Sequence, residues 1–358
     1  MRSLTPTLEW AGDHLRVLDQ TLLPDRVVVR DLRTVDDVVD ALRRLVIRGA
    51  PAIGVCGAYG VVMGLDQHVR APAVAGAGPA RVRAWLEPVA ARLSGARPTA
   101  VNLVWAVGRT AAAAAAGGTA TEARAFALAE AERIREADVR SCRLIGEHGR
   151  DEMASVRRVL THCNAGRLAT AGWGTALGVV YAKADAGQPV EVFATETRPL
   201  LQGARLTAWE LGEAGIPVTL LTDGAVGAMM RSGRIEAVVV GCDRVATNGD
   251  TANKIGTYTC ALAAQAHGVP FYVAGPISSF DPVLATGDGI EIEVRGEEEV
   301  RRVGGAVVAA PAEVWNPAFD VTPGALVTAF ITDVGVLRPP YRESIGAALE
   351  EAERLGLR

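Results

Sequence analysis

Short apolar runs alternate with helical segments from residue 156 onward, and this alternation constrains the fold more than any other feature of the chain. Five runs have the length and composition of strands: residues 156–162, 190–195, 218–222, 237–242 and 270–274. The segments between them, such as residues 201–214 and 257–267, have the apolar spacing of helices. Strands that alternate with helices in this way predict an α/β fold, with a parallel sheet covered by helices on both faces.

The first part of the chain has a different pattern. Between residues 35 and 152 the apolar residues recur at helical spacing, as in the stripe Val35, Val38, Val39, Leu42, Leu45 and Val46. Residues 122–144 predict a second long helix, and residues 15–18 and 27–29 predict short strands of a small leading sheet. We therefore predict a mostly helical N-terminal domain with a small sheet at residues 1–152, and a sheet domain at residues 153–358.

Composition limits the classes of function. The 358-residue chain has a formal net charge of −4 and a pI near 5.8, so no overall basic field would attract nucleic acid or an anionic membrane surface. The chain does not begin with a secretory pattern, and no charge-free apolar stretch of about 18 residues predicts a membrane span. The five cysteines are an odd number and have no metal-ligand spacing. We expect a cytoplasmic protein with reduced thiols, no metal, and no nucleic-acid or membrane partner.

Two polar residues follow candidate strands, at the ends where parallel sheets bind their ligands. Cys163 comes after residues 156–162 and Asp243 comes after residues 237–242, so both are expected to point into one crevice. Cys163 is either a site thiol among polar neighbours or a buried core thiol. Asp243 is either a partly desolvated carboxyl with a raised pKa, suited to donate a proton, or a helix N-cap or loop-stabilising group.

Only two lysines occur in the chain, and one of them, Lys254, lies in a polar loop that we expect at residues 243–256. Within this segment, Asn248-Gly249-Asp250 predicts a turn. A lysine ammonium is a compact point charge suited to a phosphate oxygen or to sugar hydroxyls. Lys254 is therefore a candidate ligand-binding residue, and the alternative is an ordinary surface lysine.

Further segments predict anion or sugar contacts. Arg48 and Gly49 close the first expected helix and a proline starts the next, which predicts a phosphate cradle. The alternative is a C-capping glycine beside a solvated arginine, and Arg97 at another helix start has the same ambiguity. Gln202, in the polar loop after the second strand, should reach toward the crevice. A loose pattern of glycines at 172, 174 and 178 lies about ten residues after its strand, which disfavours nicotinamide binding.

Longer segments carry a family resemblance: IRGAPAIGV (47–55), THCNAG (161–166), ETRPLLQGARLTAWEL (196–211), GCDRVATNGDTANKIGTY (241–258) and NPAFDVTP (316–323). Together they resemble the methylthioribose-1-phosphate isomerase family, over about residues 10–342. Its superfamily also includes archaeal ribose-1,5-bisphosphate isomerases and the regulatory subunits of the exchange factor for translation initiation factor two. The resemblance implies a helical N-terminal domain with a small leading sheet, joined to a Rossmann-like catalytic domain, usually in a homodimer.

The resemblance also implies an activity and a set of site residues. It implies conversion of 5-methylthioribose 1-phosphate to 5-methylthioribulose 1-phosphate in methionine salvage, without a cofactor. Asp243 would be the proton donor and Cys163 would stabilise the transition state, with substrate contacts from Arg48, Gly49, Ala50, Arg97, Gln202, Asn253 and Lys254. The alternatives are an isomerase of ribose 1,5-bisphosphate or 5-deoxyribose 1-phosphate, and a non-catalytic regulatory subunit that senses sugar phosphates or nucleotides. The regulatory relatives generally lack the Cys and Asp pair, which disfavours the last alternative.

Overall fold

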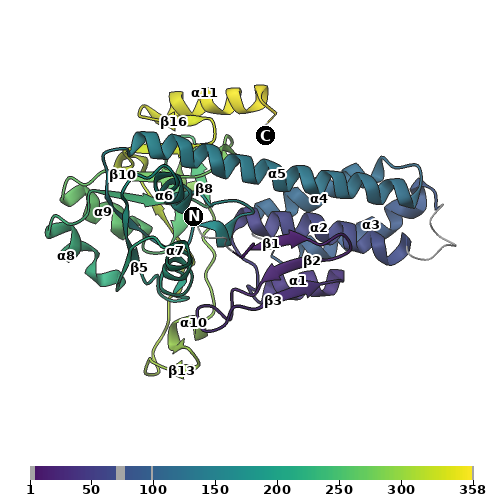
Figure 1. Ribbon diagram of the computed structural model, residues 1–358, viewed down its shortest axis with the longest axis horizontal. Helices are drawn as coiled ribbons and strands as arrows, with labels where there is room; N and C mark the ends of the chain where they lie inside the picture. The colour runs from purple at the N-terminus through teal and green to yellow at the C-terminus, as the bar shows by residue number, and fades with distance from the viewer. Residues whose placement is uncertain (1–4, 70–76, 98–99, 357–358) are drawn as a thin grey trace. The chain divides into compact units, whose positions relative to one another are not determined.

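The computed structural model describes residues 5–69, 77–97 and 100–356, and the chain divides into two compact units (Figure 1). Of the described residues, 5–140 and 167–172 form the helical unit, and 141–166 and 173–356 form the sheet unit. The predicted α/β fold class is confirmed, with a small antiparallel leading sheet and a seven-stranded, mostly parallel sheet. The domain boundary expected after residue 152 coincides with the end of a long helix and stays a prediction.

The described part of the helical unit has three strands, β1 (Leu8–Trp10), β2 (Leu15–Leu18) and β3 (Val29–Leu32). Its helices there are α1 (Val35–Arg43), α2 (Ala50–Val69), α3 (Pro79–Ser94), α4 (Val101–Ala115) and α5 (Ala120–Glu152), and α5 continues into the sheet unit. A capping box starts α1, because the Thr34 hydroxyl accepts the Asp37 N–H while the Asp37 carboxylate accepts the Thr34 N–H. The predicted apolar stripe is buried along α1. Leu45 and Val46 lie beyond the helix, since the backbone turns left-handed at Leu45 with a φ of 60°.

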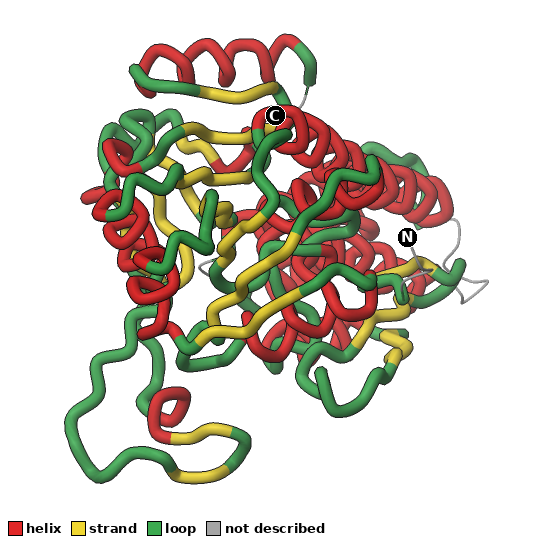
Figure 2. Tube along the Cα trace, turned by 60° about the vertical axis from the view of Figure 1, so that its left-hand side comes forward, coloured by secondary structure: helices red, strands yellow, loops and turns green. Residues whose placement is uncertain are grey.

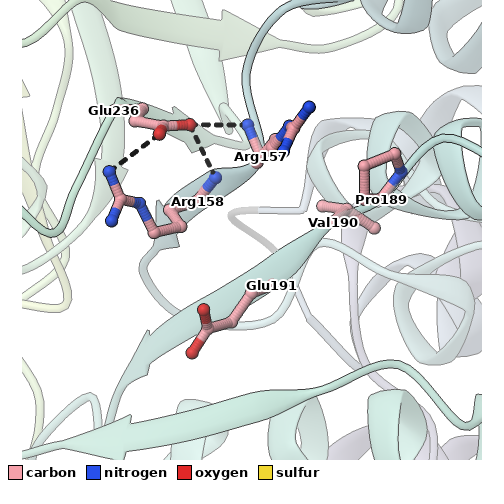
Figure 3. Close-up of a pocket in the computed structure, with 6 residues that line it drawn as sticks. All are labelled: Arg157, Arg158, Pro189, Val190, Glu191 and Glu236. Atoms are coloured by element: carbon pink, nitrogen blue, oxygen red, sulfur yellow. Dashed lines mark hydrogen bonds and ion pairs between the residues drawn. The ribbon is translucent and has the colours of Figure 1, made fainter.

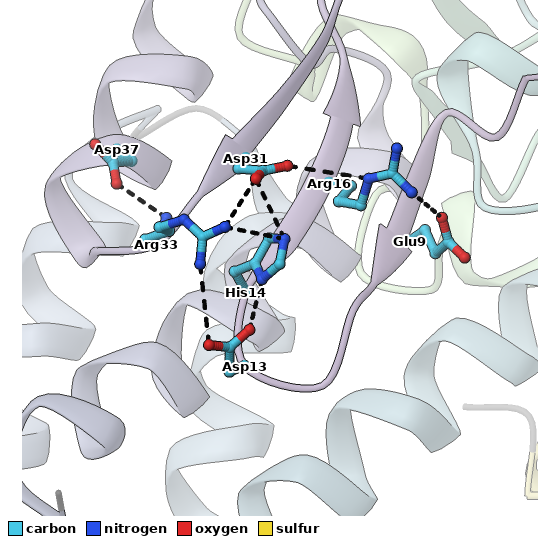
Figure 4. A network of polar contacts seen from close by, with 7 residues as sticks. All are labelled: Glu9, Asp13, His14, Arg16, Asp31, Arg33 and Asp37. Atoms are coloured by element: carbon cyan, nitrogen blue, oxygen red, sulfur yellow. Dashed lines mark hydrogen bonds and ion pairs between the residues drawn. The ribbon is translucent and has the colours of Figure 1, made fainter.

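The leading sheet has the order β1-β2-β3 and is antiparallel throughout. The predicted strand at residues 15–18 is confirmed, whereas the second runs two to three residues later than predicted. Figure 4 shows an exposed charge network on this sheet, in which Asp31 contacts both Arg33, at 2.8 Å, and His14, at 3.5 Å. Exposed ion pairs of this kind contribute about 0–1 kcal/mol each, so the buried apolar residues of β2 stabilise the sheet more than the network does.

The sheet unit is built on seven strands in the order β16-β15-β10-β7-β4-β5-β6. Their bounds are β4 (Arg158–Thr161), β5 (Glu191–Thr195), β6 (Val218–Leu221), β7 (Ala237–Val240), β10 (Phe271–Ala274), β15 (Ala329–Thr332) and β16 (Gly335–Leu337). Neighbouring strands are parallel except β15 and β16. All five predicted strands are confirmed to within two residues at each end, and β15 and β16 are strands that the sequence pattern did not predict.

Helices cover both faces of this sheet, as predicted. They are the end of α5 together with α6 (Ala176–Asp185), α7 (Ala208–Ala214), α8 (Val226–Arg231), α9 (Thr257–Ala266) and α11 (Tyr341–Arg354). Along β7, Val238 and Val240 pack in a cluster with residues of α8, α9 and α11, whereas Ala237 and Val239 pack with α5 and α6. Burial of a valine side chain stabilises the fold by about 1.5–3 kcal/mol, and the alternation explains why this strand is apolar at every position.

A second sheet of four short strands, in the order β11-β8-β9-β14, follows the first. Its bounds are β8 (Arg244–Ala246), β9 (Thr251–Lys254), β11 (Phe280–Asp281) and β14 (Phe319–Thr322). The loop expected at residues 243–256 is therefore wrong, because β8 and β9 form an antiparallel hairpin there. The turn predicted at Asn248-Gly249-Asp250 is confirmed, since the Ala246 N–H donates to the Asp250 carbonyl oxygen at 2.9 Å.

Two further segments complete the sheet unit. The helix predicted at residues 201–214 begins as a π-helical turn, Gly203–Thr207, and continues as α7. Figure 2 shows a loop-rich excursion that carries α10 (Glu298–Arg301) and the hairpin of β12 (Arg302–Val303) and β13 (Ala306–Val307) away from the sheets. In the described part of the chain, no helix combines the length and apolar character of a membrane-spanning segment.

Candidate active site

The order of the seven-stranded sheet reverses between β4 and β7. From β4 the next strands, β5 and β6, extend to one side, and the later strands β7, β10 and β15 extend to the other. In parallel sheets, ligands bind beyond the carboxyl ends of the strands at such a switch point. Leu160 pairs with Val238, so the two strands end at the same edge of the sheet. Cys163 follows the end of β4 and Asp243 follows the end of β7, which confirms the predicted placement of both residues after strands.

Cys163 differs from the core thiols. It is half-buried, and its backbone is left-handed with a φ of 65°. Cys56, Cys142 and Cys260 are fully buried, and burial raises the pKa of Cys56 and of Cys260 to about 12. A thiol with such a pKa is inert near neutral pH. The exposure and unusual backbone of Cys163 therefore favour the site-thiol alternative over the core-thiol alternative.

Lys254 ends β9 and is buried, with 7% of its surface exposed. Its Nζ donates to the Ala318 carbonyl oxygen at 2.7 Å and lies 4.6 Å from the centroid of the Phe319 ring. Burial lowers the pKa of Lys254, and the charges of Cys163 and Asp243 oppose that effect. The surface-lysine alternative is therefore wrong, and one buried ammonium interacts electrostatically with both candidate catalytic residues.

Asp243 is exposed, so the expectation of a desolvated carboxyl in an apolar setting is wrong. The reason is that β7 ends at Val240, and Asp243 opens the β8–β9 hairpin beyond the apolar run. The N-cap alternative is wrong as well, because a strand rather than a helix follows. The Asp243 N–H donates to the Ala252 carbonyl oxygen at 2.9 Å, which fixes the backbone of Asp243 at the start of the hairpin.

Gln202 and Asn253 are buried polar side chains, with 8% and 6% of their surfaces exposed. The Gln202 Oε1 has no hydrogen-bond partner among the described residues. A buried acceptor without a donor costs about 1–3 kcal/mol, so a ligand hydroxyl that donates to it would recover that loss. Asn253 is held in place, since its Nδ2 donates to the Thr257 Oγ1 at 3.0 Å.

His162 lies directly before Cys163, and sequence reasoning assigned it no role. Its Nε2 donates to the Ile255 carbonyl oxygen at 2.8 Å, and its Nδ1 accepts from the Thr195 hydroxyl at 2.7 Å. Burial lowers the pKa of His162, so the imidazole is neutral at pH 7. This ring links the segment after β4 to the segment after β9.

Asp320 is a second titratable residue that sequence reasoning did not single out. Its carboxylate accepts the backbone N–H groups of Gly256, at 2.7 Å, and Tyr258, at 3.2 Å, at the start of α9. Burial raises the pKa of Asp320 to about 6. The segment NPAFDVTP contains this residue, but no local pattern indicates that its partners lie some sixty residues earlier in the chain.

Four predicted substrate contacts belong to the helical unit. Arg48 is half-buried, and its Nε donates to Gln20 Oε1 at 3.2 Å, so it is not a solvated arginine. Gly49 has a φ of 92°, and a Cβ there would lie 2.4 Å from the Ala169 Cα. Gly49 is not a C-cap, because α1 has already ended at Arg43. Ala50 begins α2 and Arg97 precedes α4; residues 98 and 99 lie outside the described residues.

A hollow of about 470 Å³ lies at the opposite edge of the sheet (Figure 3). It is lined by Arg157, Arg158, Pro189, Val190, Glu191 and Glu236, at or just before the amino ends of β4, β5 and β7. Glu236 accepts from the backbone N–H groups of Arg157 and Arg158 and pairs with the Arg158 guanidinium at 2.8 Å. Because sheet ligands bind at the carboxyl ends, this hollow is not the candidate site. Within the described residues, no cluster of three His, Cys, Asp or Glu side chains could hold a metal ion.

Residues 46–339 match the Initiation factor 2 subunit family. The 5-deoxyribose 1-phosphate isomerase of Moorella thermoacetica is 48% identical to this chain, covering 97% of it and 98% of the relative. The methylthioribose-1-phosphate isomerase of Gemmatimonas aurantiaca is 51% identical, covering 94% of this chain and 95% of the relative.

Solved structures are similar over nearly the whole chain. A 5-methylthioribose 1-phosphate isomerase from Pyrococcus horikoshii has a TM-score of 0.91 at 36% identity, covering 98% of this chain and 97% of that one. A protein from A. fulgidus described as translation initiation factor eIF-2B, subunit delta, has a TM-score of 0.88 at 42% identity, covering 97% of this chain and all of that one. The fold of the chain is therefore shared with solved relatives of differing descriptions.

Proposed function

Because this chain belongs to the Initiation factor 2 subunit family, we propose that it is an aldose–ketose isomerase that converts 5-methylthioribose 1-phosphate to 5-methylthioribulose 1-phosphate in methionine salvage. One observation carries the proposal: Cys163 and Asp243 follow neighbouring strands at the switch point, and the buried Lys254 ends the strand β9 to which the backbone of Asp243 is hydrogen-bonded. Relatives about half identical over most of the chain are named for this activity, which supports the same reaction here.

The chemistry requires an acid and a second group near C1 and C2. The 1-phosphate blocks the anomeric oxygen, so the ring cannot open as a free sugar does. Asp243 delivers a proton to the ring oxygen as the bond from C1 to that oxygen breaks. A hydrogen then moves from C2 to C1, with Cys163 acting as a base or stabilising the developing charge. The C2 hydroxyl becomes the ketone as its proton passes to the Asp243 carboxylate, which restores the acid for the next turnover. Asp243 is an exposed residue, so a ligand can reach it, as the proposed role requires.

Binding is assigned to the remaining predicted residues. Lys254 provides a positive charge for phosphate or sugar oxygens, and the unpaired Oε1 of Gln202 accepts from a sugar hydroxyl. Asn253 adds a polar contact next to Lys254. The family resemblance assigns substrate contacts also to Arg48, Gly49, Ala50 and Arg97, and these roles belong to the proposal. Orientation by such contacts accounts for much of the rate of an isomerase without a cofactor.

5-Deoxyribose 1-phosphate is an alternative substrate for the proposed isomerase. The Moorella thermoacetica relative is named for 5-deoxyribose 1-phosphate, which differs from the proposed substrate only in lacking the methylthio group at C5. Both sugars present the same C1 phosphate and ring oxygen to the candidate site, so the same residues serve either reaction. A regulatory role like that of the exchange-factor subunits is less well supported, because this chain has the Cys163 and Asp243 pair. We further propose a cytoplasmic homodimer, as is usual for the family.

A substrate panel tests the proposed function. Purified protein is incubated with 5-methylthioribose 1-phosphate, 5-deoxyribose 1-phosphate or ribose 1,5-bisphosphate, and ketose formation is followed by carbon-13 NMR. The proposal predicts turnover of the first compound, with kcat/KM at least tenfold above that for the bisphosphate. Binding of all three without ketose formation would favour a regulatory subunit instead.

A further inference from the structure

The backbone at Cys163 is held in a conformation that a cysteine does not favour. Its φ of 65° lies in the left-handed region, where the Cβ of any residue except glycine meets steric strain. Strained residues of this kind persist only when their surroundings fix them. The direction of the Cys163 Sγ depends on this backbone, so whatever holds the backbone also aims the thiol.

Two buried threonine hydroxyls hold the backbone of Cys163, one at its N–H and one at its carbonyl oxygen. The Cys163 N–H donates to Thr197 Oγ1 at 2.9 Å, and Thr207 Oγ1 donates to the Cys163 carbonyl oxygen at 2.6 Å. Both threonines are fully buried. They come from the segment after β5 and from the π-helical turn Gly203–Thr207, so two separate parts of the chain converge on the backbone of one residue. We call these two residues the threonine clamp.

Thr197 is itself fixed. It has a φ of 64°, which is rare for a β-branched residue. The Asp223 carboxylate accepts the N–H of Thr197 at 2.8 Å and the N–H of Arg198 at 2.7 Å, one with each oxygen. This bidentate contact keeps the Thr197 hydroxyl where the Cys163 N–H meets it.

Thr207 is fixed from the other side. Its Oγ1 accepts from Asn164 Nδ2 at 3.1 Å while donating to Cys163. Asn164 is buried and also donates to the carboxylate of Glu210, which accepts from the Tyr181 hydroxyl at 2.9 Å. The clamp is therefore supported by buried polar partners on both sides.

A line of hydrogen bonds connects the clamp to the lysine segment. The Thr197 and Thr195 hydroxyls lie 3.3 Å apart, the Thr195 hydroxyl donates to His162 Nδ1, and His162 Nε2 donates to the carbonyl oxygen of Ile255, next to Lys254. The positions of the thiol and of the Lys254 segment are thus coupled through paired side chains.

We propose that Thr197 and Thr207 are positioning residues that hold the Cys163 backbone left-handed and so aim its thiol at the substrate. The inference rests on the proposed role of Cys163. Release of either hydroxyl lets residue 163 relax toward a negative φ, which swings Sγ away from its reactive position. Misplacement of a reacting group by about 1 Å can reduce turnover about 100-fold. KM should change little, because neither hydroxyl is assigned a substrate contact.

Conservative variants test the clamp. Thr197→Val keeps the branched shape and removes the hydroxyl, and it should lower kcat about 100-fold with KM within about twofold. Thr197→Ser restores the hydroxyl and should recover most of that loss. The matched control is Thr332→Val, because Thr332 is equally buried and its Oγ1 also accepts a backbone N–H, from Val334 at 3.2 Å, and donates to a carbonyl, that of Gly335, at 2.7 Å. The control should keep kcat.

Alkylation of the thiol separates positioning from general stability. The rate at which iodoacetamide modifies Cys163, followed by peptide mass spectrometry, should differ at least threefold between Thr197→Val and wild type, and should be unchanged in Thr332→Val. An unchanged kcat in Thr197→Val overturns the proposal, and so does a loss of kcat without a change in alkylation. If Thr197→Val does not fold, Thr207→Val makes the same test from the carbonyl side. Wild-type activity in Cys163→Ser would instead remove the proposed role of Cys163.

Discussion

The two lysines of the chain allow a direct comparison, because both are buried but they differ in surroundings. Lys183 is fully buried in α6, where its Nζ donates to the Met153 carbonyl oxygen at 2.7 Å and to Gln188 Oε1 at 2.9 Å. Among the described residues, the Lys254 ammonium donates one hydrogen bond, to the Ala318 carbonyl oxygen, and it also contacts an aromatic ring. We predict that Lys183→Met mainly reduces stability, whereas Lys254→Met mainly reduces substrate binding.

The magnitudes follow from the contacts. Lys254→Met removes one charge-assisted hydrogen bond, worth about 1.5–3 kcal/mol, and a cation–π contact, worth about 0.5–2 kcal/mol. It also removes the desolvation penalty of a buried ammonium, which is several kcal/mol, so the net change in unfolding free energy should be near zero. Lys183→Met removes two further charge-assisted hydrogen bonds, because Lys183 Nζ also contacts the Ala154 carbonyl oxygen at 3.4 Å, and it should be less stable than Lys254→Met by at least about 2 kcal/mol.

Substrate binding should be weakened more in Lys254→Met than in Lys183→Met. Loss of an ionic contact from Lys254 to a substrate oxygen, worth about 1.5–3 kcal/mol, raises KM about 10- to 150-fold. Thermal melts and steady-state kinetics on 5-methylthioribose 1-phosphate, at a temperature where both variants are folded, give the two quantities. A KM of Lys254→Met within threefold of wild type would contradict a substrate contact from Lys254. A loss of stability in Lys254→Met as large as that in Lys183→Met would contradict the predicted order of the two variants.

Two further predictions concern buried polar groups. Gln202→Leu removes the Oε1 acceptor, which has no partner among the described residues. The variant should therefore have an unfolding free energy about 1 kcal/mol higher than wild type and a raised KM. A fall in stability with an unchanged KM would contradict this prediction. Burial raises the pKa of Asp320 from 3.8 to about 6, so the native state binds this proton more tightly than the unfolded chain. The stability from this group is therefore present at low pH and is lost as pH rises from about 4 to about 6. The side chain of Asp320→Asn cannot ionise, so the unfolding free energy of this variant, measured by urea melts, should not show the fall between about pH 4 and about pH 6 that this group causes in wild type. An equal fall in wild type and in Asp320→Asn would contradict the raised pKa of Asp320.

Local patterns were enough to predict five strands of the seven-stranded sheet, but not its strands β15 and β16 or the four-stranded sheet. The five predicted strands are apolar runs, and each is confirmed. The strand β9 has the sequence Thr-Ala-Asn-Lys, which shows no apolar alternation, and it pairs with β14, residues 319–322, far along the chain. The pairing of such short polar strands depends on tertiary contacts that no local window contains.

The candidate site was predictable where it depended on strand ends and motifs. Cys163, Asp243 and Lys254 were identified in that way, although the exposure of Asp243 and the burial of Lys254 required the structure. Thr197 and Thr207 could not be identified as partners of Cys163, because their contacts depend on left-handed backbone angles and span 34 and 44 positions of the chain. Threonine is too common for its presence in a motif to indicate such a role.

Turnover of 5-methylthioribose 1-phosphate by three proteins tests the proposed roles of Asp243 and Cys163. Wild type, Asp243→Asn and Cys163→Ser are compared by NMR for ketose formation, with substrate binding measured by calorimetry. The proposed mechanism predicts ketose from wild type, no detectable turnover by Asp243→Asn despite retained binding, and severe impairment of Cys163→Ser. Turnover by folded Asp243→Asn at the wild-type rate would contradict it.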